Sequence, residues 1–586
     1  MISERKLTVV LIICIGILIC LRIYPALTLP LHGDEGSDLY IVSRDAVSFS
    51  RFFSDEISFA FDQSRFSHLI GAIIMGITGV NSANLLEKLG TIRLVFLLFH
   101  IGYLIVSYRL IMGVSGDRRA AWIYTFLLSV SCYLSSFSIS MMTTGEGVFM
   151  LFHLLSIKIF YENFQKAAEG DGIFKQFLLL SLVLALCIAG KLFGVLLLIS
   201  FFVFALCNSK TVRQFSITTA HPGMILGASL SFFITIVLIN VFSIPLMTKS
   251  IAALASGLLY VCCMLVLAAK EHRGRYLPRK IHFVAFWALL AFVTFTLVLV
   301  FSPIYLNLKN IINVFSWYGT WNAGAVAPDS KYYDALIILV MKYGIASTVV
   351  LVAAAGTGLF FMITSPSSDN RSPAGSFHFL IMIVITLHVV LISTAQFKLV
   401  WHPLAVFPFL YLPFAGLWVM VSNGKPVVLK YILIVAVLFV AGDNLYRYGS
   451  WYPHGHLDGG QYGSRFVGVN KPCFVTFEGI PVFFEYITGE MENDSVKIRQ
   501  INVKGSNSPI LNSYLQRMLA LYFKTKGLGG IRFVRRSLQA DRSDVIVSSP
   551  IYNPECEQEL SGGDYTRIKT LSISKVIIAT VWKRNN

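Results

Sequence analysis

The sequence contains few charged residues for its length. Of its 586 residues, 13% are charged, whereas soluble globular proteins contain about 25%. Hydrophobic residues make up 55%, and the mean hydropathy is +0.69. The apolar residues group into stretches of about 17 to 25, which is the length needed to span a bilayer. This composition excludes a soluble enzyme and predicts a polytopic α-helical membrane protein.

Two kinds of motif are also missing. The nine cysteines form no CxxC pair and no Cys/His cluster, so no zinc site of the usual spacing is predicted. No glycine-rich phosphate loop stands between a strand and a helix. The net charge of +17 would suggest nucleic-acid binding in a soluble chain, but membrane proteins concentrate basic residues in cytoplasmic loops. We therefore predict no nucleic-acid partner.

Thirteen stretches are long and apolar enough to be membrane spans. They lie near 7–24, 91–113, 120–139, 146–161, 175–189, 191–207, 223–244, 250–269, 281–302, 344–363, 376–395, 404–421 and 427–446. An odd number places the two termini on opposite sides. If the N-terminus is cytoplasmic, most basic residues of the short connections fall inside, and the short outer connections carry only Lys191, Lys249 and Lys398. This asymmetry predicts a multi-pass inner-membrane protein whose C-terminal region faces the periplasm or exterior.

Two domains follow from these spans. Residues 1–446 form a transmembrane domain with outer loops at 25–90 and 303–343, and residues 447–586 form an α/β domain outside the membrane. Within the first outer loop, residues 69–80 are apolar but too short to cross, so they predict an interfacial or re-entrant helix.

The C-terminal domain is predicted from its local patterns. Short runs rich in β-branched residues predict strands at 473–477, 496–503, 531–534 and 545–548. A helical pattern at 510–523 lies between them.

Three acidic residues are predicted to gather at the outer ends of membrane spans. Asp34 and Glu35 follow the first span, and Glu146 opens the fourth. Adjacent carboxylates near the hydrocarbon boundary are costly to dehydrate unless they meet protons, cations or a ligand. We therefore predict that the three converge on one outward cavity. A solvated acidic turn is the alternative interpretation of Asp34 and Glu35.

Three further residues lie at predicted outer hairpins. Lys191 falls inside the nearly continuous apolar run 176–207, where a cation needs an anionic partner such as a phosphate or one of the carboxylates. Snorkelling of its ammonium to the interface is the alternative. Lys398 and His402 lie at a later hairpin, where anchoring at the interface is the common role of such residues.

The order of these motifs resembles the GT-C glycosyltransferases. The pattern consists of Asp34-Glu35, a juxtamembrane stretch at Phe61–Val80, a segment from Leu89 to Arg93, then Glu146, Lys191 and a Lys398-x-x-x-His402-Pro turn. It is most similar to the protein O-mannosyltransferases and the lipid A aminoarabinose transferase, including their thirteen spans and outer C-terminal domain. The resemblance covers about residues 1–446.

The resemblance implies an enzyme that transfers a sugar from a polyprenyl-phosphate carrier, such as undecaprenyl phosphate, outside the membrane. It implies that Asp34 is the base for the acceptor hydroxyl and that Glu35 and Glu146 shape the site. If a divalent metal ion is bound, Asp34 and Glu146 are its predicted ligands. Lys191 and Lys398 are the implied contacts to the donor phosphate, together with His402.

Two departures from the family pattern stand out. The arginine that often follows the acidic pair is replaced by Gly36-Ser37-Asp38, and a Pro-Pro-Leu-Tyr-like run is replaced by the segment from Arg65 to Leu69. Within that segment, Arg65 and His68 are the candidates to replace the lost phosphate contacts.

The chemistry leaves the acceptor and one competing function open. A sugar on a lipid phosphate has a good leaving group, so one carboxylate base and cationic stabilisation suffice. The acceptor could be a cell-envelope glycan, a lipid such as lipid A of lipopolysaccharide, or a protein. The alternative function is a lipid or polysaccharide transporter or flippase. Such proteins usually place ionisable groups near the midplane and contain repeats, whereas here the acids gather on one face.

Overall fold

The structure is a computed structural model of the whole chain, and its description covers part of it. The described residues are 4–28, 42, 65–81, 84–85, 88–131, 134, 146–169, 174–207, 283–301, 345–364, 373–394, 405–422, 427–451, 500–503, 532–534, 545–548, 554–573 and 576–585, with scattered residues between 218 and 280.

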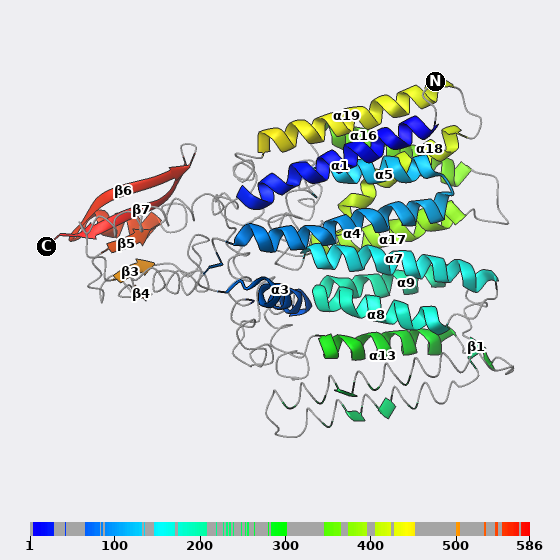
Figure 1. Cartoon of the computed structure of the whole chain (residues 1–586), viewed down its shortest axis with the longest axis horizontal. Helices are drawn as coiled ribbons and strands as arrows, with labels where there is room; N and C mark the ends of the chain where they lie inside the picture. The colour runs from blue at the N-terminus through cyan, green and yellow to red at the C-terminus, as the bar shows by residue number, and fades with distance from the viewer. Residues whose placement is uncertain are drawn as a thin grey trace.

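The membrane part is a bundle of long helices that run back and forth beside one another (Figure 1). They are α1 (Glu4–Thr28), α4 (Leu89–Ser115), α5 (Arg118–Val130), α7 (Glu146–Glu169), α8 (Phe174–Gly190), α9 (Val195–Cys207), α13 (Phe283–Phe301), α16 (Ile345–Thr364), α17 (Pro373–Thr394), α18 (Leu412–Ser422) and α19 (Val427–Trp451). The short turns η3 (Leu192–Gly194) and η6 (Phe407–Tyr411) precede α9 and α18. Each helix coincides with a predicted span. The predicted spans 223–244 and 250–269 lie largely outside the described residues.

Several helices differ in extent from the predicted spans, and α5 is one example. The helix predicted over 120–139 is α5, which ends at Val130. One of its last carbonyls, that of Ser129, accepts a hydrogen bond from Arg22 of α1. A buried guanidinium therefore takes over a carbonyl at the helix end that would otherwise lack a partner.

The outer faces of the bundle are apolar. By length and composition, α4 and residues 428–446 of α19 can each cross a membrane. Large apolar side chains are exposed along several helices; examples are Val10, Ile13 and Ile17 of α1, Leu98 and Ile105 of α4, Val349 and Val352 of α16, and Val435 and Leu438 of α19. Soluble proteins rarely expose continuous apolar faces of this extent, whereas helices in a bilayer turn them toward lipid. The chain is accordingly described as a helical membrane protein.

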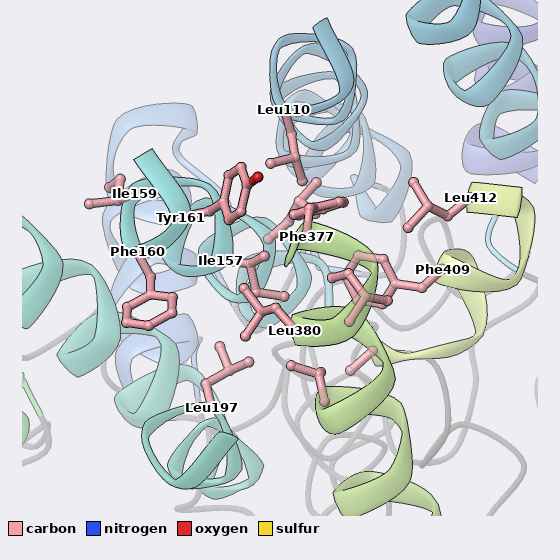
Figure 2. Packing of buried hydrophobic residues seen from close by; sticks show 14 of the residues in the cluster. Leu110, Ile157, Ile159, Phe160, Tyr161, Leu197, Phe377, Leu380, Phe409 and Leu412 are labelled. Carbon is pink, nitrogen blue, oxygen red and sulfur yellow. The ribbon is translucent and has the colours of Figure 1, made fainter. Parts of the chain in front are cut away.

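A continuous apolar core holds α7 at the centre of the bundle. Figure 2 shows Ile157 of α7 beside Phe377 and Leu380 of α17. On the other side of α7, Phe160 stacks on Phe201 of α9 with ring centroids 4.0 Å apart. Because α7 is packed on both sides, the position of its first residue, Glu146, is fixed by the core.

The short helix predicted at 69–80 is α3, which runs from Arg65 to Thr78. His68, Ala72 and Met75 are buried on one face, while Ile73 and Ile77 are exposed on the other. In Figure 1, α3 lies at the end of the bundle nearest the C-terminal sheet. Its helical structure is confirmed, and its placement at the membrane interface stays a prediction.

The C-terminal region contains a mixed sheet. Its strands are β3 (Gln500–Val503), β4 (Arg532–Val534), β5 (Val545–Ser548), β6 (Tyr565–Ile573) and β7 (Val576–Arg584), in the order β4-β3-β5-β7-β6. β3 pairs in parallel with β4 and β5, and the remaining pairs are antiparallel. A short helix, α23 (Pro554–Ser561), packs Leu560 against Ile546 and Trp582. A separate two-residue pairing joins β1 (Thr218–Thr219) to β2 (Arg279–Lys280).

Three of the four predicted strands are confirmed. β3, β4 and β5 fall within the predicted runs, while 473–477 and the predicted helix 510–523 lie outside the described residues. The β6–β7 hairpin was not predicted. Figure 1 shows the sheet and the N-terminus at opposite ends of the bundle. The domain boundary at 446/447 stays a prediction, and α19 continues past it to Trp451.

Candidate functional site

Three of the predicted site residues have described side chains: Glu146, Lys191 and His68. Arg65 begins α3, and only its backbone is described. The other predicted site residues, Asp34, Glu35, Lys398 and His402, lie outside the described residues. The site is therefore built from the Glu146 end of α7 and the turn that carries Lys191.

A tight turn between α8 and α9 positions Lys191. The Lys191 backbone is extended, its N–H donates to the Cys187 carbonyl (3.0 Å), and its carbonyl accepts from Gly194 N–H (2.9 Å). A Cβ on Gly194 would lie 2.9 Å from both Cys187 Sγ and the backbone nitrogen of Ile188. Only glycine fits this position without displacing its neighbours.

The turn also packs closely against the start of α7. A Cβ on Gly190 would lie 3.6 Å from the Cα of Phe149, one turn into α7. This close approach brings Lys191 within reach of Glu146, which is the first residue of that helix. Backbone packing between α7 and α8 therefore determines which side chains meet here.

Glu146 and Lys191 form a buried ion pair. Lys191 Nζ donates a hydrogen bond to Glu146 Oε1, and the two side chains are 12% and 4% exposed, respectively. Lys191 Nζ also lies 5.7 Å from the centroid of the Phe193 ring, within cation–π range. A pair so poorly hydrated is costly to break by removing one partner, at about 3–5 kcal/mol. The sequence suggested a phosphate or a carboxylate as the partner of Lys191, and in the structure the partner is the Glu146 carboxylate.

His68 lies on the buried face of α3, fully shielded from solvent. α3 packs against α8, the helix that leads to Lys191, and against α4.

A pair of buried histidines was missed by the sequence analysis. His153 follows Glu146 by seven residues on α7 and so lies two turns further along the same face. Its ring centroid is 5.4 Å from that of His388 on α17, with the rings nearly perpendicular (85°). His388 Nδ1 lies 2.8 Å from the Val384 carbonyl, which can only accept, so Nδ1 carries the proton. The seven-residue spacing is visible in the sequence, but the partner on α17 is not.

A buried arginine inside the first span was also missed. Arg22 is 2% exposed. Its Nη1 lies 2.5 Å from His100 Nε2 of α4, and its Nη2 donates to the Ser129 carbonyl of α5. Guanidinium nitrogens only donate, so His100 Nε2 is the acceptor. An arginine within an apolar stretch was the available signal.

The predicted metal ligands are only partly covered by the structure. Among the described ranges, no group of three or more His, Cys, Asp or Glu side chains could hold a metal ion. Asp34, which was paired with Glu146 as a candidate ligand, lies outside those ranges.

Comparison with known proteins identifies similar solved structures but no matching family model or curated protein. Similar solved structures include ArnT from Cupriavidus metallidurans in the apo state (13% identity, 97% of each chain covered, TM-score 0.48). The same protein bound to undecaprenyl phosphate has 14% identity, with 97% of each chain covered and a TM-score of 0.45.

A second neighbour is the oligosaccharyltransferase AglB from Archaeoglobus fulgidus, in complex with an inhibitory peptide and a dolichol-phosphate. Its identity is 12%, the match covers 94% of this chain and 70% of AglB, and the TM-score is 0.45. The Archaeoglobus enzyme has also been solved in complex with Zn and sulfate. Both neighbours are GT-C enzymes. The sequence pattern resembles the same family. At these identities and TM-scores, the function of the chain has to be argued from its own residues.

Proposed function

We propose that this protein is a membrane glycosyltransferase that moves a sugar from a polyprenyl-phosphate-linked donor to an acceptor hydroxyl at the outer face of the inner membrane. Asp34 is the base that takes the acceptor proton, and Glu35 and Glu146 shape the acidic side of the site. Lys191, with Lys398, Arg65, His68 and His402 as further candidates, contacts the donor phosphate.

One observation carries the proposal: a buried lysine and a buried carboxylate meet where a predicted outer hairpin touches the first turn of α7. Transfer from a lipid phosphate needs a cation at the departing phosphate, and Lys191 supplies one. It also needs carboxylates near the acceptor, and Glu146 lies directly beside that cation. The motif order in the sequence supports the same chemistry.

The acceptor and any metal belong to the same proposal. A glycan, a lipid or a protein with a free hydroxyl would serve as acceptor. A divalent ion, if the enzyme uses one, is assigned to Asp34 and Glu146. Such an ion would neutralise charge beside the phosphate.

One observation would be consistent with the alternative function, a lipid or polysaccharide transporter. It is the contact between Arg22 and His100. These side chains meet inside the bundle, where transporters often place ionisable groups. Arg22 of α1 contacts His100 of α4 and the Ser129 carbonyl of α5, so it links three helices. This arrangement supports a role in helix packing, so we favour transfer.

Sugar transfer can be tested directly with purified protein. Incubation with radiolabelled polyprenyl-phosphate sugars and a membrane extract should move label to an acceptor in a carrier-dependent reaction. A transporter would instead move lipid between the leaflets of a proteoliposome without breaking the sugar–phosphate bond. Intact donor after prolonged incubation with every sugar and acceptor fraction would contradict the proposal.

The orientation gives a second expected result. With single cysteines in a cysteine-free variant, an impermeant thiol reagent applied to intact cells should label a cysteine at Ser464 and not one at Ser372. Ser464 belongs to the predicted outer domain and Ser372 to a predicted inner loop. Labelling of the Ser372 variant alone would reverse the orientation and move the site to the cytoplasmic side.

A further inference from the structure

Glu146 is already paired with Lys191, the residue whose ammonium the proposed function assigns to the donor phosphate. We infer that the donor phosphate and Glu146 compete for Lys191, so that donor binding opens their ion pair and releases the Glu146 carboxylate into the site. The inference rests on the proposed function, because it takes the phosphate of a polyprenyl carrier as the ligand of Lys191. It adds an order of binding, with the donor before the acceptor.

Charge makes the two anions exclusive. In the ion pair the carboxylate and the ammonium cancel, and both side chains are almost fully buried. A carrier phosphate brings at least one more negative charge to Lys191. In a site with so little water, a phosphate and a carboxylate on one ammonium repel each other strongly. Glu146 must therefore leave Lys191 when the phosphate arrives.

The exchange needs side-chain movement alone. The Lys191 backbone is held by hydrogen bonds at both its N–H and its carbonyl. Close packing at Gly194 fixes the turn itself. The lysine side chain is long and rotatable, with three donors on its ammonium. The turn therefore stays in place while Nζ changes partner.

Both partners keep a favourable environment after they separate. Glu146 is the first residue of α7, where the helix dipole and the unpaired N–H groups favour a negative charge. Lys191 Nζ remains near the Phe193 ring, which attracts a cation. When the pair opens, the Glu146 carboxylate and the Lys191 ammonium therefore each keep a favourable electrostatic partner.

The exchange links donor binding to the chemistry. Without donor, the Glu146 carboxylate is tied to Lys191 and is not available to an acceptor hydroxyl or to a cation. With donor bound, a free carboxylate appears beside the phosphate that will leave. The acidic side of the site is thus completed only when there is a sugar to transfer.

The test measures carrier binding to the full-length protein in nanodiscs, with undecaprenyl phosphate as the probe. Glu146→Gln removes the competing charge and keeps the shape, so it should bind undecaprenyl phosphate about fivefold or more tightly than wild type. Lys191→Ala should bind more weakly. In the double variant, Glu146→Gln should give no gain, because the gain requires Lys191. Unchanged or weaker binding by Glu146→Gln, or a gain that persists without Lys191, would overturn the inference.

Cross-linking tests the same exchange in the wild-type protein, whether or not the variants fold. A hydrophobic carbodiimide joins a carboxyl to a touching amine as an amide and takes up the released water as a urea. Mass spectrometry should find the Glu146–Lys191 amide in carrier-free protein, and undecaprenyl phosphate should suppress it. Undecaprenol, which has the same chain without phosphate, should leave it unchanged. A cross-link that survives saturating undecaprenyl phosphate would show that the two anions do not compete.

The outcomes separate this inference from the proposed function. If wild-type protein binds no undecaprenyl phosphate, the donor assignment fails and with it the proposed function. If it binds the carrier but Glu146 has no competing effect, only the inference fails.

Discussion

Replacing Asp34 by asparagine is expected to lower sugar transfer by about 100-fold or more. The amide keeps the shape of the side chain but cannot take the proton of an acceptor hydroxyl. Membrane insertion should be unaffected, because an amide near the bilayer is cheaper to dehydrate than a carboxylate. The rate of carrier-dependent transfer by purified variant and wild type, at equal amounts of folded protein, measures the effect.

Asp38→Asn is the matched control for this experiment. It removes one carboxylate from the same loop, four residues away, at a position with no assigned role. Transfer by the control should stay near the wild-type rate. A folded Asp34→Asn protein with near-normal transfer would remove Asp34 as the base and shift attention to Glu35.

The second large effect is expected at Gly194. An alanine there would place its Cβ 2.9 Å from Cys187 Sγ and from the Ile188 nitrogen, and the backbone atom cannot move aside easily. Overpacking of this kind costs about 1–3 kcal/mol. The turn should also shift and carry Lys191 away from Glu146, so transfer should fall together with stability. Thermal unfolding in detergent and the transfer rate are the two measurements.

Gly190→Ala provides the comparison within the same hairpin. Its Cβ would meet Phe149 at 3.6 Å, an ordinary van der Waals distance, so stability should change by no more than about 0.5 kcal/mol. If the two alanine variants unfold at the same temperature, close packing at Gly194 does not hold the turn.

The sequence predicted those parts of the fold that depend on local composition. Apolar length located the helices, and the fourth predicted span begins at Glu146, as α7 does. The run of β-branched residues at 545–548 coincides with β5. These features were predictable because hydrophobic length and strand propensity are properties of short segments.

The contacts between helices could not be predicted in the same way. The meeting of His153 with His388 depends on how α7 packs against α17, and no spacing within either helix specifies it. The hydrogen bond from Arg22 to the Ser129 carbonyl near the end of α5 joins residues that are 107 positions apart in the chain. Lys191 was recognised as needing an anion, but the choice of Glu146 followed from the close approach of Gly190 to Phe149.

Arg22 has a consequence for how the protein is made. When α1 enters the membrane during synthesis, its acceptors on α4 and α5 lie 78 and 107 residues further along the chain and have not yet been inserted. An arginine at the centre of a lone inserting helix costs about 2.5–3.5 kcal/mol, and the cost falls toward the helix end, where Arg22 lies in α1. The newly inserted α1 therefore keeps its guanidinium near interfacial water, where a long side chain can reach. Insertion of α4 and α5 then supplies the buried partners of Arg22, so α1 reaches its final position only after both of those later helices are in place.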